Sequence, residues 1–307
     1  PGPEGESMLL IFDCLLAAAL VGVAAHGFWA REHFQAVVMF IIFGLLLAMA
    51  WTRLNSPDIA ITEAGIGAGL TGVLLMNALG SLSAAQPGLR LKVCVGLFLP
   101  AAGLAGLLVL AFSSAPLQAP GLGPVVQSAL SRASFEYPVT AVLLDFRGYD
   151  TWLEMGVLLA AVVGVLGLRS RPGLKGALAP GPAEPVGTWV VNIVFPCMLL
   201  IGGYLLWLGS SAPGGAFQAG VVLAAAGVML WQSGRSALSA LPFLGLRIFV
   251  VAGFSAFALL AVFSLIRSQA LFTHPQAKIW VLGVEYAASA SIAACLISLV
   301  VACGQQD

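Results

Sequence analysis

The chain has 307 residues, of which 60% are hydrophobic and only 8% are charged, and its formal net charge at pH 7 is zero. A soluble domain carries about 25% charged residues, so this chain lacks the polar surface that a globule in water needs. The composition excludes a soluble enzyme and a basic nucleic-acid surface. It indicates an all-α integral membrane protein with the lipid bilayer as its solvent.

A membrane-spanning helix needs about 20 mostly apolar residues. Nine stretches meet that description, at 8–25, 35–52, 58–79, 91–112, 151–168, 188–208, 216–232, 242–266 and 278–303. Residues 1–7 precede the first methionine, and we expect them to be a leader or a remnant of expression. We expect the first stretch to be a retained helix rather than a signal peptide. The predicted architecture is about nine transmembrane helices.

Two further segments stand outside these stretches. In PVVQSALSRASF (124–135) the apolar residues follow helical spacing with polar residues opposite, which predicts one amphipathic helix at the membrane interface or against a partner. Residues 171–187 are rich in proline and glycine, which cannot continue a helix. They predict a linker between two membrane modules, at 8–170 and 188–307.

The third stretch begins with SPDIAITEAGIGAGLTG. Ser56 has the chemistry of a helix cap, Pro57 suits the first helical position, and Asp58 is favourable at the positive end of the helix dipole. The glycines form a formal GxGxxG, but a dinucleotide site needs a strand before them. Because they lie inside a predicted membrane helix, we interpret this match as accidental.

On an ideal helix the small and polar residues of this stretch occupy two faces. One face would let a neighbouring backbone approach closely, and it holds Gly65, Gly69 and Gly72. The other is an i, i+4, i+8 line of Glu63, Gly67 and Thr71. Three glycines in so short a stretch also favour a π-bulge or local flexing of the helix.

Glu63 is the most informative residue of the stretch. A carboxylate one turn inside the bilayer is costly and usually faces a partner or a water-filled path. It can lie near the headgroups and pair with Arg53, or it can relay a proton or cation. We favour the relay.

The stretch SPDIAITEAGIGAGL resembles the signature of the C-terminal part of the Mrp antiporter A-type protein, and of the D-type protein of membrane-bound hydrogenases. In that family the module is related to a complex I membrane-arm subunit near its ion-handling region. The resemblance implies that Glu63 belongs to an ion path.

A second motif, YPVTAVLLDFRGYDTWLE, precedes the fifth predicted helix. Asp145 and Arg147 are placed to pair across a bend at Gly148. Thr151 and Glu154 have capping-box spacing, which is the favoured interpretation of Glu154, with a functional carboxylate as the alternative. The motif resembles the hydrogenase E-type protein, which follows the D-type module in the Mrp A-type protein.

A third motif breaks a helix with Pro213, Gly214 and Gly215. It resembles the Mrp B-type (MnhB-like) protein, which has four helices and a glycine-rich turn. Family members often carry His-Asn-type residues where this chain has Ser210 and Ser211, so we expect this turn to be structural. In the last helix a buried acid, Glu285, suggests either a hydrogen bond to a neighbouring helix or a place on an ion path.

Together the motifs predict a fused membrane subunit of a multi-subunit Mrp-type cation/proton antiporter in a bacterial inner membrane. It would bridge large antiporter-like and small membrane subunits and handle H⁺ and possibly Na⁺ without a metal or cofactor of its own. The candidate ion-path residues are Glu63, Glu285, Glu154, Asp58, Asp13 and Thr71. Alternatives are a pump-arm subunit of a hydrogenase or respiratory complex, a part of an inorganic-carbon uptake complex, and a structural adaptor; redox catalysis would then belong to partners.

Overall fold

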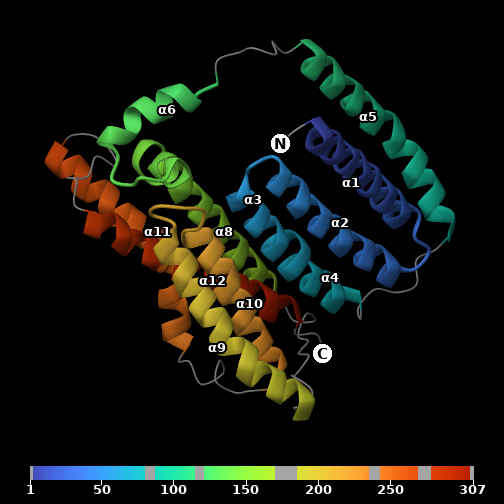
Figure 1. Ribbon diagram of the computed structural model, residues 1–307. Helices are drawn as coiled ribbons and strands as arrows, with labels where there is room; N and C mark the ends of the chain where they lie inside the picture. Colours follow the sequence, from blue (N-terminus) through green and yellow to red (C-terminus); the bar gives the residue numbers. More distant parts are fainter. Residues whose placement is uncertain are drawn as a thin grey trace.

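The computed structural model describes residues 3–79, 87–114, 121–169, 185–234, 243–268 and 278–304. Every regular element within these ranges is a helix (Figure 1). Seven helical stretches are long and apolar enough to cross a membrane. The chain is therefore an all-α, multi-pass membrane protein, as its composition predicts.

The long helices follow the predicted stretches. They are α1 (Pro3–Trp29), α2 (His33–Arg53), the continuous α3 (Pro57–Thr62), η1 (Glu63–Leu70) and α4 (Thr71–Leu79), then α5 (Pro87–Ser114), α8 (Gly148–Arg169), α9 (Pro185–Leu208), α10 (Ala216–Gln232), α11 (Phe243–Ser268) and α12 (Lys278–Gly304). Two described stretches are apolar but shorter than a full span, Pro100–Ser114 and Ala216–Gln232. The predicted linker at 171–187 lies mostly outside the described residues.

Short elements occupy the region between α5 and α8. They are α6 (Gly123–Ala129), η2 (Leu130–Arg132), α7 (Pro138–Thr140) and η3 (Ala141–Phe146). The predicted amphipathic helix is shorter than expected, because it ends at Ala129 and continues as a 3-10 turn. Val125 is 62% exposed whereas Phe135 is only 1% exposed, so the segment presents α6 outward and anchors its C-terminal part in the core.

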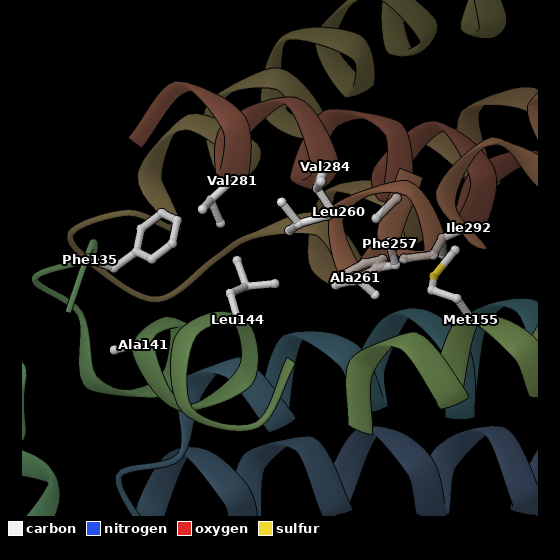
Figure 2. Close-up of a cluster of buried hydrophobic side chains, with 11 residues drawn as sticks. Phe135, Ala141, Leu144, Met155, Phe257, Leu260, Ala261, Val281, Val284 and Ile292 are labelled. Carbon is white, nitrogen blue, oxygen red and sulfur yellow. The ribbon is translucent and has the colours of Figure 1, made fainter. Parts of the chain in front are cut away.

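The main core joins this segment to the C-terminal helices (Figure 2). Phe135 and Leu144 from the segment pack with Met155 of α8, Phe257 of α11 and Ile292 of α12. Burial of a large apolar side chain stabilises a fold by about 1.5–3 kcal/mol in water, but in lipid close packing must supply most of the stabilisation. The region 121–146 is thus packed against the C-terminal helices α11 and α12 as well as against α8.

The two groups of helices meet along α3, η1 and α4, which contact α10 and α12. Within this junction η1 contacts α2 of the N-terminal group and α10 of the C-terminal group. A Cβ atom added at Gly65 would overlap the Val221 side chain of α10, and one added at Gly72 would lie 2.8 Å from Ile41 of α2. These two contacts support a packing role for Gly65 and Gly72. The single glycine face is wrong, because a π-helix has a different register from an α-helix.

Candidate functional site

Glu63 is the first residue of η1, a π-helix of eight residues. The π-helix is a rare element that is frequent at functional sites. A second π-helix, η3, covers Ala141–Phe146 and contains Asp145. Both π-helices coincide with motifs that carry the resemblance, and the first confirms the irregularity that the glycines predict.

The side chain of Glu63 extends along its own helix towards Gly67, four residues further along the chain. A Cβ atom at Gly67 would overlap Glu63 Oε1, so the absence of a side chain at Gly67 leaves room for the carboxylate. The residue is half-buried, as is Thr71 at the start of α4. The alternative pairing of Glu63 with Arg53 is wrong, because Arg53 pairs with another acid.

That acid is Asp13 of α1. Arg53 Nε lies 2.7 Å from Asp13 Oδ1 and Nη2 lies 2.9 Å from Oδ2, a two-point ion pair. The Arg53 guanidinium also lies 6.0 Å from the ring centre of Phe12. Asp13 therefore fixes α1 against α2, away from Glu63, and geometry favours a structural role for it over an ion path.

We expect Asp13→Ala and Arg53→Ala each to lower the melting temperature of the purified protein by a similar amount. Each single change leaves one charge unpaired in a predicted span. The double variant should lose clearly less than the sum of the two, because the second change removes only an already unpaired charge. Thermal unfolding of all four proteins in one detergent measures this, and strictly additive losses would contradict the pairing.

Asp58 is the centre of a polar cluster and is only 7% exposed. Its Oδ2 accepts a hydrogen bond from the Tyr137 hydroxyl at 2.5 Å, and its Oδ1 accepts one from the Gly214 N–H at 2.8 Å. Gln218 Nε2 lies 3.4 Å from the same Oδ1. One carboxylate thus connects α3, the segment before α7, the glycine turn and α10.

The sequence predicts part of this arrangement. Ser56 and Pro57 occupy the cap and first position of α3, although the Ser56 side chain makes no capping bond. Tyr137 and Gln218 are functional candidates that the sequence analysis did not single out. Tyr137 is the first residue of the second motif, and Gln218 is a polar residue inside an apolar helix. Burial, followed by the hydrogen bond to Asp58, raises the pKa of Tyr137, so its phenol stays protonated and remains a donor.

Hydrogen bonds from Tyr137 and Thr140 hold the turn between α9 and α10. The Thr140 hydroxyl donates to Gly209 O at 2.6 Å, and the Tyr137 N–H donates to Ser210 O at 3.4 Å. Gly214 has φ +156° and Gly215 has φ +114°, values that L side chains rarely adopt. The backbone geometry and these bonds support the structural role expected for the turn.

Glu285 of α12 lies on the other side of the turn and is 2% exposed. A Cβ atom at Gly215 would lie 3.1 Å from Glu285 Oε1, and the carboxylate accepts a hydrogen bond from the backbone of Ala216. Among the described residues, Glu285 Oε2 and Ser289 Oγ, one helical turn further on, have no hydrogen-bond partner. Asp58 and Glu285 therefore both lie against the glycine turn, Asp58 at Gly214 and Glu285 at Gly215.

The remaining candidates lie apart from this cluster. The recorded ion pair of Arg147 is with Asp150, not with Asp145 as expected, while Asp145 Oδ2 accepts the Ser134 N–H at 2.6 Å. The capping box is also wrong, since α8 already begins at Gly148. The Thr151 hydroxyl instead donates to Leu143 O at 2.7 Å. Glu154 is exposed on α8.

Comparison with known proteins places this geometry in a family context. Residues 17–84 match the MbhD family, the D-type protein of MBH, and residues 186–305 match a domain related to the MnhB protein of Na⁺/H⁺ antiporter. The chain is 25% identical over 260 residues to a probable K⁺/H⁺ antiporter protein of the A/B type from Rhizobium meliloti (strain 1021), covering 73% of this chain and 26% of that protein. The chain thus spans about a quarter of this relative.

Two solved structures share the fold. A chain of the Mrp complex from Dietzia sp. DQ12-45-1b superposes with a TM-score of 0.74 at 21% identity, covering 95% of this chain and 35% of that one. A chain of an archaeal membrane-bound sulfane sulfur reductase has a TM-score of 0.58 at 18% identity, covering 71% of this chain and 100% of that one. The chain thus carries an MbhD-type match followed by an MnhB-type match, and in this it is similar to antiporter proteins of the A/B type.

Proposed function

We propose that this chain is a membrane subunit of a multi-subunit Mrp-type cation/proton antiporter in a bacterial inner membrane. In this role it bridges other subunits and contributes carboxylates to a proton or sodium path, without catalysing a reaction itself. The names of the relatives support the assignment to antiport. The observation that carries the proposed site is the position of Glu63 at the start of a π-helix, where the two modules meet.

The surroundings of Glu63 support this role. Its carboxylate occupies the space left by Gly67 and has no recorded ion pair in the described part of the chain. An unpaired acid in a membrane helix usually marks a functional site. Asp58, one turn earlier on the same continuous helix, and Glu285 across the glycine turn extend the set of buried acids towards α12.

We expect Glu63→Gln to abolish Na⁺-dependent or K⁺-dependent proton movement while the assembled complex remains intact. The amide keeps the size of the carboxyl group but can neither take up a proton nor neutralise a cation. The measurement is the ΔpH response of everted membrane vesicles to added Na⁺ or K⁺, with complex recovery scored by pull-down. Glu32→Gln, at an exposed acid of the same module, is the matched control.

Two other results would contradict the proposal in different ways. Full antiport by the Glu63→Gln complex removes this carboxylate from the path. Loss of assembly makes Glu63 a structural residue of the junction.

The sulfane sulfur reductase fold supports a second candidate, the membrane arm of a respiratory enzyme. Gentle extraction of the native complex followed by mass spectrometry separates the two. Large antiporter-like subunits without redox proteins support the antiporter. Iron–sulfur or nickel–iron partners make this chain part of a pump, and a chain that purifies alone contradicts both.

A further inference from the structure

A groove of about 570 Å³ runs along α8. One wall is a single stripe of α8 that includes Asp150, Leu153, Glu154 and Val157 and ends at Ala161. Ile66 of η1, Phe217 of α10 and two residues of α12 line the opposite wall. None of the roles argued above uses this groove.

The groove is polar at one end and apolar along the rest of its length. Both of its acids, Asp150 and Glu154, lie in the first two turns of α8, and α8 belongs to a candidate membrane span. Leu153 and Val157 are 59% and 70% exposed, so the groove is open along its side. An apolar groove with a charged end at the edge of a span has the form that an amphiphile in the bilayer would fill.

The shape of the groove suits a lipid acyl chain. The stripe from Asp150 to Ala161 is about 16 Å long at 1.5 Å per residue. An alkyl chain can lie along such a stripe with its charged headgroup at the Asp150 end.

The charges at the polar end select the headgroup. Arg147 pairs with Asp150 but its side chain is still 62% exposed, so donors of the guanidinium remain available for a phosphate. Glu154 offers an exposed carboxylate one turn beyond Asp150. Asp150 is neutralised by its pair with Arg147, so the remaining guanidinium donors and the Glu154 carboxylate complement a zwitterionic headgroup, which has both a phosphate and an ammonium group.

We propose that this groove binds one phospholipid with a primary-ammonium zwitterionic headgroup. Its phosphate lies at Arg147, its ammonium at Glu154, and one acyl chain lies along α8 against Ile66 and Phe217. The acyl chain of the lipid would then contact η1 at Ile66, three residues after Glu63. The proposal goes beyond the antiporter assignment, because a lipid can bind here whether or not Glu63 carries ions.

The test is native mass spectrometry of the full-length protein after delipidation. The probes are phosphatidylethanolamine, phosphatidylglycerol and phosphatidylcholine with identical acyl chains, each offered in mixed micelles. We expect one tightly held phosphatidylethanolamine per chain. Glu154→Gln should reduce its affinity about threefold to tenfold, which is the range for one charge-assisted contact, and should not reduce phosphatidylglycerol binding.

Substitutions that block the apolar end of the groove test the proposal independently. Ala161→Trp should remove the bound lipid, whereas Val163→Trp, at a 61% exposed position of α8 outside the groove, should retain it. If Ala161→Trp does not fold, Val157→Trp replaces it. Equal binding of the three lipids, or equal lipid retention by the Ala161 and Val163 variants, would overturn the proposal. A groove filled by a partner's side chains and free of lipid would overturn it too.

Discussion

Replacing Asp58 by alanine is expected to destabilise the protein by about 2–6 kcal/mol, the cost of leaving two buried donors without an acceptor. The change leaves the Tyr137 hydroxyl and the Gly214 N–H without their acceptor, and each buried unsatisfied donor costs about 1–3 kcal/mol. We expect the melting temperature in detergent to fall by roughly 5–15 °C. The two modules should also become separable by limited proteolysis.

Two further variants define the cause. Asp58→Asn keeps one acceptor oxygen and should lose less stability than Asp58→Ala. Glu136→Ala removes an exposed acid next to Tyr137 and should leave the melting temperature unchanged. An Asp58→Ala protein as stable as the Glu136→Ala protein would show that this carboxylate does not hold the modules together.

The second large effect is expected at Gly214. In Gly214→Ala the new Cβ would overlap Leu205 O and lie 3.3 Å from Gly209 N, at a φ of +156°. Backbone strain of this kind costs about 1–3 kcal/mol, and the clash with the α9 carbonyl adds to it. We expect a melting temperature lowered by at least several degrees, and weaker antiport in the assembled complex because the turn also positions Asp58.

Gly203→Ala is the matched control for this prediction. An added Cβ at Gly203 meets no atom within 4 Å, and the residue lies in the regular part of α9. This change should be neutral or slightly stabilising, since it reduces the freedom of the unfolded chain. Equal behaviour of the two variants would mean that the turn relaxes without consequence.

Distance along the chain explains why some features of the site could be predicted and others could not. The glycines near Glu63 predict a local irregularity of the helix, because they are local features of one stretch. The Asp58 cluster was not predicted, because its donors come from Tyr137 and Gln218, 79 and 160 residues away along the chain. No local pattern encodes a contact over that distance.

The ion pairs likewise depend on helix packing rather than on closeness in sequence. Arg53 is close in sequence to Glu63, and the alternative interpretation paired them on that ground. The structure pairs Arg53 with Asp13, 40 residues earlier, because the antiparallel packing of α1 and α2 brings these side chains together. Likewise Arg147 pairs with Asp150 because α8 begins early enough to place them three residues apart on one helix.

The sequence by itself determined the helical membrane architecture, the approximate positions of the long helices and the three family motifs, because hydropathy and helix-breaking residues act locally. Only the tertiary structure decided which acid joins the modules, which helix each glycine packs against, and where α8 leaves a groove. These depend on side chains from distant helices meeting at one place. Helix packing and the register of a π-helix set that place, and neither can be read from one stretch alone.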